Sequence, residues 1–214
     1  MKKSCLLFDN DGTLVDSEYL CNLAIAQQFA ELGVTLDVDD LVRNYRGGKL
    51  SEILGSLALR HQVKLRDDAE KNYRQRVAQL FDEQLKPVSG IETALAQLPQ
   101  VKAVVSNGPR KKIEHALQVC DLRHYFSDRL FSAYDLGLHK PDPHIYLESA
   151  KKLGFTPEQC VVIEDSETGV SAGSRAGIST LFYNKFNEAL DLPHVTSFTD
   201  MRELPALIDA LSAE

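Results

Sequence analysis

Short apolar runs alternate with longer stretches of helical periodicity through most of the chain after about residue 87. Each run has the character of a buried parallel strand, and each longer stretch has the spacing of an amphipathic helix. Strands that alternate with helices predict an α/β fold: a doubly wound, Rossmann-like, mostly parallel sheet with right-handed crossovers. We expect strands at 4–7, 101–106, 129–133, 160–164, 179–183 and 195–198, and helices near 90–98, 110–120, 143–154, 168–176 and 200–212.

The stretch between the first two expected strands has a different pattern, with helical periods and no convincing strand. Its apolar positions at helical spacing include Leu20, Leu23, Ala24, Phe29, Leu50, Ile53, Leu54 and Leu57. We therefore expect a core domain made of 1–16 and 87–214, with an α-helical cap domain inserted at 17–86. The two short connections, at 16–17 and 86–90, are typical of the hinges of a lid.

The composition is that of an ordinary globular protein, since 43% of the 214 residues are hydrophobic and 26% are charged. A net charge of −7 argues against broad binding of nucleic acid or anionic membranes, because both require basic surfaces. The four cysteines form no CxxC pair, so disulfides and zinc are poorly supported. No segment resembles a membrane span or a signal peptide. We expect a cytoplasmic protein, a monomer or a weak dimer, with neither nucleic-acid nor membrane partners.

Two carboxylates, Asp9 and Asp11, follow the first apolar run and precede a Gly12-Thr13 pair. In open α/β sheets, ligands bind at the carboxyl ends of the strands. One carboxylate can attack a phosphorus atom while the other moves a proton, and together they can hold a divalent cation. The same residues also suit a solvated turn, because Asp and Gly favour turns. Taken alone, this segment leaves the alternatives open.

Three later segments place polar groups after other expected strands. Residues 106–109 offer a hydroxyl, an amide and a glycine N–H to a phosphoryl oxygen, or alternatively a helix N-cap. Lys140 follows an apolar run and precedes two prolines, which limit where its point charge can lie. Alternatively, it is a surface lysine before a helix. Glu164 and Asp165 suit a hard cation such as Mg²⁺; alternatively, Asp165 or Ser166 caps the next helix. The joint pattern favours function more strongly than any one segment does.

The four segments together resemble the four motifs of the haloacid dehalogenase superfamily, and the resemblance covers essentially the whole chain. The motifs are 9–16 (DNDGTLVD), 106–108 (SNG), 140–143 (KPDP) and 164–169 (EDSETG). The helical insertion is similar to the small α-helical cap of that family. The fourth motif is similar to the phosphoglycolate phosphatase and β-phosphoglucomutase branch. Stretches at 104–109 and 124–135 look most like bacterial phosphatases of the 6-phosphogluconate type.

The resemblance implies a role for each matching residue. Asp9 becomes the nucleophile, and Asp11 becomes the general acid toward the leaving alcohol and then the base that activates water. Ser106 and Lys140 hold phosphoryl oxygens. Mg²⁺ is bound by Asp9, the Asp11 backbone carbonyl, Asp165 and Glu164, the last directly or through water. The substrate contacts expected in addition are Thr13, Asn107 and Gly108.

A Gly-Gly turn interrupts two expected cap helices, and Arg46 and Lys49 flank it. Our hypothesis is that one of these two cations binds the non-reacting end of the substrate, a carboxylate or a hydroxyl. An ordinary solvated turn between helices is the alternative. A solvated helix face, without ligands, is the expectation for Arg110, Lys111 and Lys112.

The sequence predicts a Mg²⁺-dependent phosphatase that forms an aspartyl-phosphate. Its expected substrate is a small phosphorylated metabolite, a sugar phosphate or sugar-acid phosphate, with 6-phosphogluconate among the candidates. Dehalogenase activity is disfavoured because dehalogenases lack the second acid of the first motif, whereas this chain has Asp11 at that position. A phosphomutase is the first rival, but the His of related mutases is missing from 18–21. A phosphoacceptor signalling domain shares the acids, hydroxyl and lysine but is shorter and has no cap, and a binding protein with a relic site is the third alternative.

Overall fold

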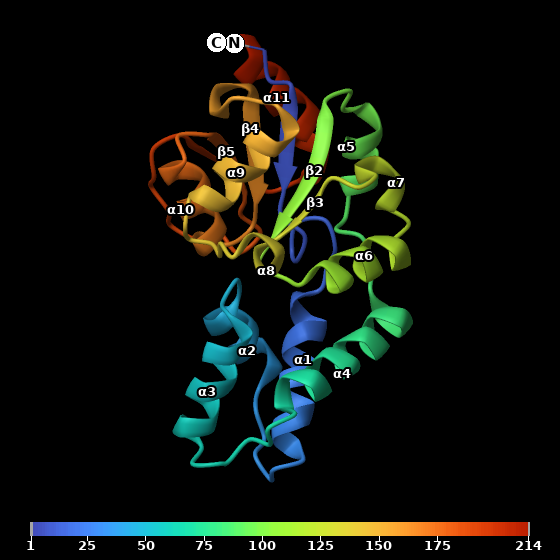
Figure 1. The fold of residues 1–214 in the computed structure, drawn as a ribbon, viewed down its shortest axis with the longest axis vertical. Coiled ribbons are helices and arrows are strands. Elements are labelled where there is room, and N and C mark those ends of the chain that lie inside the picture. Colours follow the sequence, from blue (N-terminus) through green and yellow to red (C-terminus); the bar gives the residue numbers. More distant parts are fainter. Residues whose placement is uncertain (1, 214) are drawn as a thin grey trace.

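A six-stranded sheet forms the upper part of the molecule in the computed structural model, which describes residues 2–213 (Figure 1). The strands are β1 (Cys5–Phe8), β2 (Val101–Ser106), β3 (Leu130–Ser132), β4 (Cys160–Glu164), β5 (Ser179–Tyr183) and β6 (Val195–Phe198). They lie in the order β3-β2-β1-β4-β5-β6, and every neighbouring pair is parallel. The predicted doubly wound, Rossmann-like α/β fold is confirmed. Because the order reverses beside β1, ligands are expected at the carboxyl end of that strand.

Helices cover both faces of the sheet, so alternate residues of one strand enter two different cores. In β1, Leu6 and Phe8 belong to one apolar cluster, while Cys5 and Leu7 belong to the other. This explains why the strands are apolar without a break. The first face packs against α5 (Ile91–Gln97), α6 (Arg110–Val119), α7 (Arg123–Phe126) and α11 (Leu204–Ala213), and the second against α8 (Ala133–Leu136), α9 (His144–Leu153) and α10 (Glu167–Arg175). Two 3₁₀ turns are η1 (Pro157–Gln159) and η2 (Met201–Glu203).

Four helices form the lower part of the molecule, and we call them the cap helices (Figure 1). They are α1 (Glu18–Ala30), α2 (Val38–Tyr45), α3 (Leu50–Arg60) and α4 (Ala69–Gln84). Helix α1 packs against both α2 and α4, and Phe29, Leu57 and Phe81 are fully buried among them. The all-helical character expected for this insertion is confirmed for the described residues.

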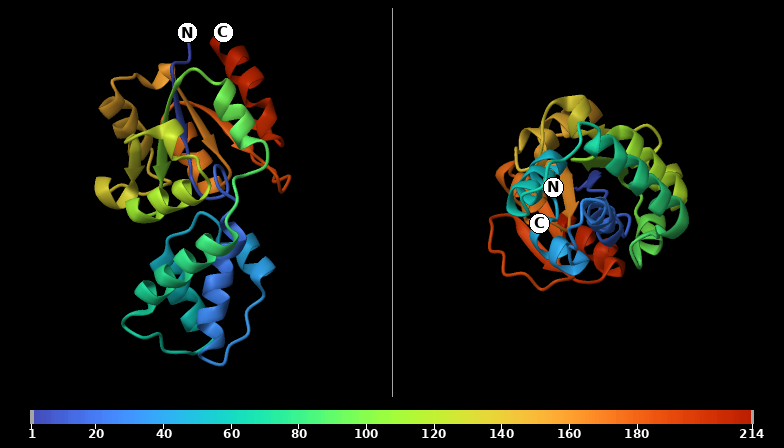
Figure 2. Two further views of the ribbon diagram at one scale, coloured as in Figure 1. Left: turned by 90° about the vertical axis from the view of Figure 1, so that its right-hand side faces the viewer. Right: turned by 90° about the horizontal axis from the view of Figure 1, so that it is seen from below.

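Two chain segments connect the cap helices to the sheet, and they run side by side (Figure 2). The backbone N–H of Asp16 donates to the carbonyl of Lys86 at 2.9 Å, and that of Val88 donates to the carbonyl of Leu14 at 3.0 Å. This pairing holds both connections together where a lid would turn. The domain boundaries that we expected at 16/17 and 86/87 stay a prediction.

The expected bounds of β2, β4, β5 and β6 agree with the structure residue for residue. The short helices α7 and α8 were not expected from the sequence, because four residues make a single turn and carry no periodic signal. Among the described residues, no helix combines the length and the apolarity needed to cross a membrane.

Candidate active site

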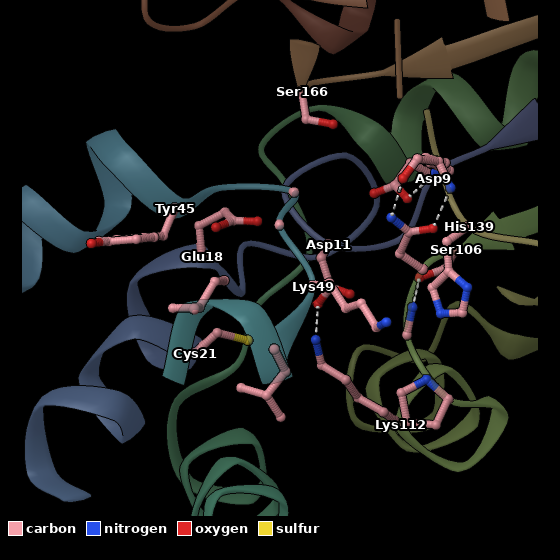
Figure 3. Close-up of a pocket in the computed structure, with 18 of the residues that line it drawn as sticks. Asp9, Asp11, Glu18, Cys21, Tyr45, Lys49, Ser106, Lys112, His139 and Ser166 are labelled. Carbon is pink, nitrogen blue, oxygen red and sulfur yellow. Dashed lines mark hydrogen bonds and ion pairs between the residues drawn. The ribbon is translucent and has the colours of Figure 1, made fainter. Parts of the chain in front are cut away.

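The polar ends of β1, β2 and β4 meet where the sheet faces the cap helices, and they line one cavity of about 130 Å³. Asp9 directly follows β1, Ser106 ends β2, and Asp165 follows β4. Because the three strands are parallel neighbours, their carboxyl ends lie on the same edge of the sheet. Figure 3 shows that side chains of the cap, among them Glu18, Tyr45 and Lys49, close the cavity from the other side.

The ammonium group of Lys140 joins two buried carboxylates at the centre of the site. Its Nζ donates to Oδ1 of Asp9 at 2.5 Å and to Oε1 of Glu164 at 2.6 Å. All three residues are buried, where an unpaired charge would be costly. Asn107 lines the cavity, and its expected contact with substrate stays a prediction. Its Oδ1 accepts the backbone N–H of Lys140 at 2.8 Å. The structure therefore shows Asn107 fixing the loop that carries the lysine.

Glu164 is the most fully satisfied acid of the site. Its Oε1 also accepts the hydroxyl of Tyr146 at 2.9 Å. Its Oε2 accepts the backbone N–H of Asp165 at 3.0 Å, and the N–H and hydroxyl of Ser166 at 3.2 and 3.1 Å. Helix α10 begins so close to this carboxylate that a Cβ on Gly169 would lie 1.7 Å from Oε1. Protein donors thus fix both oxygens of Glu164.

Oxygens of Asp9, Glu164 and Asp165 lie within 4.8 Å of one another. Burial raises the pKa of Asp9 well above its usual range, against the opposing effect of Lys140, and the neighbouring acids raise it further. Burial also raises the pKa of Asp165, with further repulsion from Glu18 and Glu164. Oδ2 of Asp165 is buried without a hydrogen-bond partner. A divalent cation would relieve both the repulsion and the unsatisfied oxygen, so this donor set fits a metal that prefers oxygen ligands.

Thr13 and the backbone beside Gly12 lie against Asp165 from the β1 side. The hydroxyl of Thr13, which we expected to contact substrate, donates to Oδ1 of Asp165 at 3.3 Å. A Cβ on Gly12 would lie 2.2 Å from Oδ2 of Asp165, and Gly12 has a φ of +79°. Only glycine therefore allows the chain to turn this close to the acid.

Asp11 has surroundings that differ from those of Asp9. Its Oδ1 accepts the hydroxyl of Ser17 at 2.6 Å and Nζ of Lys112 at 2.7 Å. Burial alone would raise the pKa of Asp11, but the charge of Lys112 and these hydrogen bonds outweigh it and lower that pKa. The other oxygen, Oδ2, faces Gly108: a Cβ on Gly108 would lie 3.7 Å from it. Oδ2 is thus the oxygen of Asp11 that is available for proton transfer.

The solvated helix face predicted for three cations of α6 is wrong for Lys112, whose side chain is only 21% exposed and contacts Asp11. The reason is tertiary, because the carboxylate that attracts Lys112 lies on a distant loop. Lys111 is exposed as expected. Arg110 donates to Oδ2 of Asp135 at 2.8 Å and to the carbonyl of Leu130 at 2.7 Å.

Ser106 is buried at the end of β2, and its Oγ accepts the N–H of Gly108 at 3.0 Å. The alternative that residues 106–107 cap the next helix is wrong, because the N-cap of α6 is Pro109. At the fourth motif the helix-cap interpretation is confirmed for Ser166, whose hydroxyl accepts the N–H of Gly169 at 3.2 Å and caps α10.

The two cations of the cap turn lie in different places. Lys49 lines the cavity and is about half exposed. Arg46 points elsewhere: its guanidinium donates to Glu188 at 2.6 and 2.7 Å and stacks 4.7 Å from the ring centre of Phe186. Between them, a Cβ on Gly47 would lie 3.0 Å from Ser166. The turn therefore touches the fourth motif of the core.

Sequence reasoning missed Glu18 and Tyr146 as members of the site. Burial, followed by repulsion from Asp11, raises the pKa of Glu18 to about 7. Glu18 is the first residue of α1, where an acid is normal for electrostatic reasons, so its position carries no signal of burial. Tyr146 looks like an ordinary core residue of a helix, and only its contact with Glu164 distinguishes it.

Known proteins resemble this chain in sequence and in fold. Residues 3–177 match the haloacid dehalogenase-like hydrolase family. The 6-phosphogluconate phosphatase of Escherichia coli K12 is 38% identical over 205 residues, which cover 94% of this chain and 93% of that protein. The phosphorylated carbohydrates phosphatase of Thermotoga maritima is 32% identical, with 83% of each chain covered.

Among solved structures, a haloacid dehalogenase family hydrolase from Deinococcus radiodurans, with bound phosphate and sodium, has a TM-score of 0.76 at 27% identity. The similarity covers 97% of this chain and 96% of that one. The family match covers more than half of the chain, and the relatives agree with it. The chain therefore belongs to the haloacid dehalogenase-like hydrolases, and it is an enzyme of their phosphatase branch.

Proposed function

We propose that this enzyme is a Mg²⁺-dependent phosphatase that hydrolyses a sugar phosphate or sugar-acid phosphate through a phosphoryl group on Asp9. The observation that carries the proposal is the contrast between two acids on one loop. Asp9 is held by Lys140 inside the acidic cluster, whereas Asp11 is held apart by Ser17 and Lys112. Two carboxylates in unlike surroundings are suited to unlike roles in acid–base and nucleophilic chemistry.

In the proposed reaction, an oxygen of Asp9 attacks the phosphorus atom and the bond to the ester oxygen breaks. Asp11 gives a proton to the departing oxygen, and it must take up that proton against the charge of Lys112, which lowers its pKa. Water then attacks the phosphorus atom while Asp11 takes back a proton, which releases inorganic phosphate and restores Asp9. Lys140, and Ser106 at the end of β2, hold phosphoryl oxygens during both transfers, because phosphoryl transfer depends chiefly on positioning and charge neutralisation.

The metal that fits the site would be held by Asp9, Asp165 and the backbone carbonyl of Asp11, with Glu164 supporting from behind. Mg²⁺ is the proposed ion because the donors are all oxygens and the substrate is a phosphate. When bound, it supplies positive charge that lets an anionic carboxylate approach an anionic phosphoryl group. The buried, unpartnered Oδ2 of Asp165 supports this assignment.

The substrate class rests on the relatives named above, one acting on 6-phosphogluconate and the other on phosphorylated carbohydrates. A phosphomutase is less well supported, because α1 contributes Glu18 and Cys21 to the described cavity lining and no histidine. The cytoplasmic location and the monomeric or weakly dimeric state stay predictions.

The test is release of inorganic phosphate from a panel of sugar and sugar-acid phosphates, measured with Mg²⁺ and with a chelator. Asp9→Asn is expected to lower kcat/KM by at least about a thousandfold, because the nucleophile is lost. Asp191→Asn, the same change at an exposed position, is the control and should retain full activity. Undiminished turnover in Asp9→Asn would refute the mechanism, and turnover that is insensitive to the chelator would refute the metal.

A further inference from the structure

The side chain of Lys112 runs along the cavity wall from the core toward the cap helices, and Figure 3 shows its ammonium group directed at Asp11. Its Nζ is 2.7 Å from Oδ1 of Asp11 and 5.7 Å from the centre of the Phe81 ring on α4. The side chain is only 21% exposed. Lys112 is thus a largely buried cation at the junction of the core and the cap.

The hydrogen-bonding capacity of this ammonium group is mostly unused. A lysine ammonium has three N–H donors, and among the described residues only Asp11 accepts one from Lys112. Glu18, Tyr73 and Cys21 line the same cavity, and within residues 2–213 none of them forms a hydrogen bond or an ion pair with Lys112. Because buried donors without acceptors are costly, the arrangement favours a ligand oxygen at this point.

The position of that oxygen follows from Asp11, if the proposed function holds. Asp11 must reach the ester oxygen of the substrate with its free Oδ2, so that oxygen lies on the Gly108 side of the carboxylate. Lys112 contacts the other oxygen of the same carboxylate. A substituent on the next carbon atom of the leaving group has three staggered positions about the bond to the phosphate-bearing carbon. One that turns it toward Oδ1 of Asp11 would bring it to Lys112.

We propose that Lys112 is a specificity-determining residue that binds an oxygen on the carbon next to the phosphate-bearing carbon. The preferred substrates then contain an O–C–C–O unit at the leaving group, as phosphate esters of vicinal diols and of hydroxy acids do. This inference rests on the proposed function, since it uses Asp11 as the proton donor. Simple alkyl phosphates lack the second oxygen and would leave the ammonium group of Lys112 unsatisfied.

The experiment compares glycerol 3-phosphate with 3-hydroxypropyl phosphate, which keeps the carbon chain and the terminal hydroxyl and lacks only the neighbouring hydroxyl. In Lys112→Met, the ratio of the two kcat/KM values is expected to fall by about tenfold to a hundredfold, the usual worth of a hydrogen bond to a charged group. The loss of the Asp11 contact affects both substrates and cancels in the ratio. Lys111→Met, which removes the neighbouring exposed charge, should leave the ratio unchanged.

An equal loss on both substrates in Lys112→Met would overturn the inference, because Lys112 would then act only through Asp11. Lys112→Leu, which likewise has no donor, is the second variant should the methionine variant not fold, and the same fall in ratio is expected from it. If the wild type released phosphate from no ester at all, the proposed function would fail. Calorimetric binding of the same two esters to Asp9→Asn protein, with and without Lys112→Met, decides the inference separately: the preference for glycerol 3-phosphate must disappear with Lys112.

Discussion

At the scale of single residues, the site is defined by what surrounds each carboxylate. Asp9 and Asp11 are two residues apart on one loop, yet the pKa of Asp9 is raised by burial while that of Asp11 is lowered by Lys112 despite burial. Taken alone, these shifts favour a neutral Asp9 and an ionised Asp11. The proposed roles therefore require a cation beside Asp9, which would favour its ionised form, and a proton taken up by Asp11 against Lys112. Glu18, a third acid nearby, provides a measurable consequence of the same effect.

Glu18→Gln is expected to change how stability depends on pH. In the folded state the pKa of Glu18 is raised from 4.5 to about 7, so below pH 4.5 the carboxyl is neutral in both states. As pH rises from 4.5 to about 7, the unfolded state ionises first and the folded state loses stability. The variant lacks this loss. Between pH 4.5 and about pH 7, the difference in free energy of unfolding between the variant and the wild type should therefore rise by up to about 3 kcal/mol in favour of the variant.

The measurement is urea unfolding at pH 4.5 and pH 8 in the presence of a chelator, which keeps metal binding out of the comparison. Glu83→Gln, at an exposed position of α4, is the control and should show no such gain. A difference between Glu18→Gln and the wild type that stays constant with pH would contradict the buried, neutral carboxyl.

At the scale of elements, the start of α10 shows how closely a helix approaches the catalytic edge of the sheet. A Cβ on Gly169 would lie 1.7 Å from Glu164, whereas a Cβ on Gly55 in α3 would meet nothing within 4 Å. Both glycines are helical, so they differ in their neighbours rather than in their secondary structure. The loop before α1 is restricted in the same way where Gly12 touches Asp165.

Gly169→Ala is expected to lower the free energy of unfolding by about 1–3 kcal/mol, because the added methyl group displaces Glu164 or the helix. Gly55→Ala should raise it by about 0.5–1 kcal/mol, because alanine has the better helix propensity and space is available. Chemical denaturation of both variants beside the wild type checks the pair. If both substitutions changed the free energy of unfolding by the same amount, Glu164 would have moved aside without cost, and the prediction would be contradicted.

At the scale of the whole molecule, the cap helices and the core meet through contacts between residues far apart in the sequence. Arg46 of the cap turn reaches Glu188, 142 residues away, and stacks on Phe186. A second contact between core and cap joins the ammonium group of Lys112 to the ring of Phe81 in α4. The two connecting segments are paired with each other by backbone hydrogen bonds. If the cap turned about them as a lid, these two contacts would break on opening and re-form on closing.

Arg46→Met and Glu188→Gln are each expected to lower kcat/KM by a similar factor for every substrate, because both break one contact that favours the closed cap. The double variant should be no worse than either single variant, since the two residues share one interaction. The folded state should lose more than the about 0–1 kcal/mol typical of an exposed ion pair, because the Arg46 side chain is only 9% exposed. The kcat/KM values are therefore compared well below the melting temperature of each variant. Arg43→Met, which breaks an ion pair within α2, is the matched control.

A loss in Arg46→Met that depended on the substrate, without a similar loss in Glu188→Gln, would show instead that Arg46 binds substrate, as the sequence had suggested. Lys49 is the better candidate for that role, because it lines the cavity while Arg46 does not.

The sequence by itself determined the sheet, the helical insertion and the residues that gather at the strand ends. These features depend on local signals: apolar runs, helical periodicity, and acids or glycines directly after a strand. Asp9, Ser106 and Asp165 were therefore predictable, since parallel strands bring their carboxyl ends to one edge. Lys140 lies beyond α8 rather than at the end of β3, and it was identified by its resemblance to the third motif of the family. Their individual roles in the reaction remain proposals.

The tertiary structure alone decided which partner each polar side chain finds. Lys112 meets Asp11 across 101 residues and Arg46 meets Glu188 across 142, and neither pairing has a local signal. Asn107 holds the backbone of Lys140, and Thr13 holds Asp165. Buried charges and donors must be paired, and the chain satisfies that requirement with whichever groups the fold brings close. Which residues surround the leaving group is for this reason a property of the folded molecule, and Lys112 was identified there.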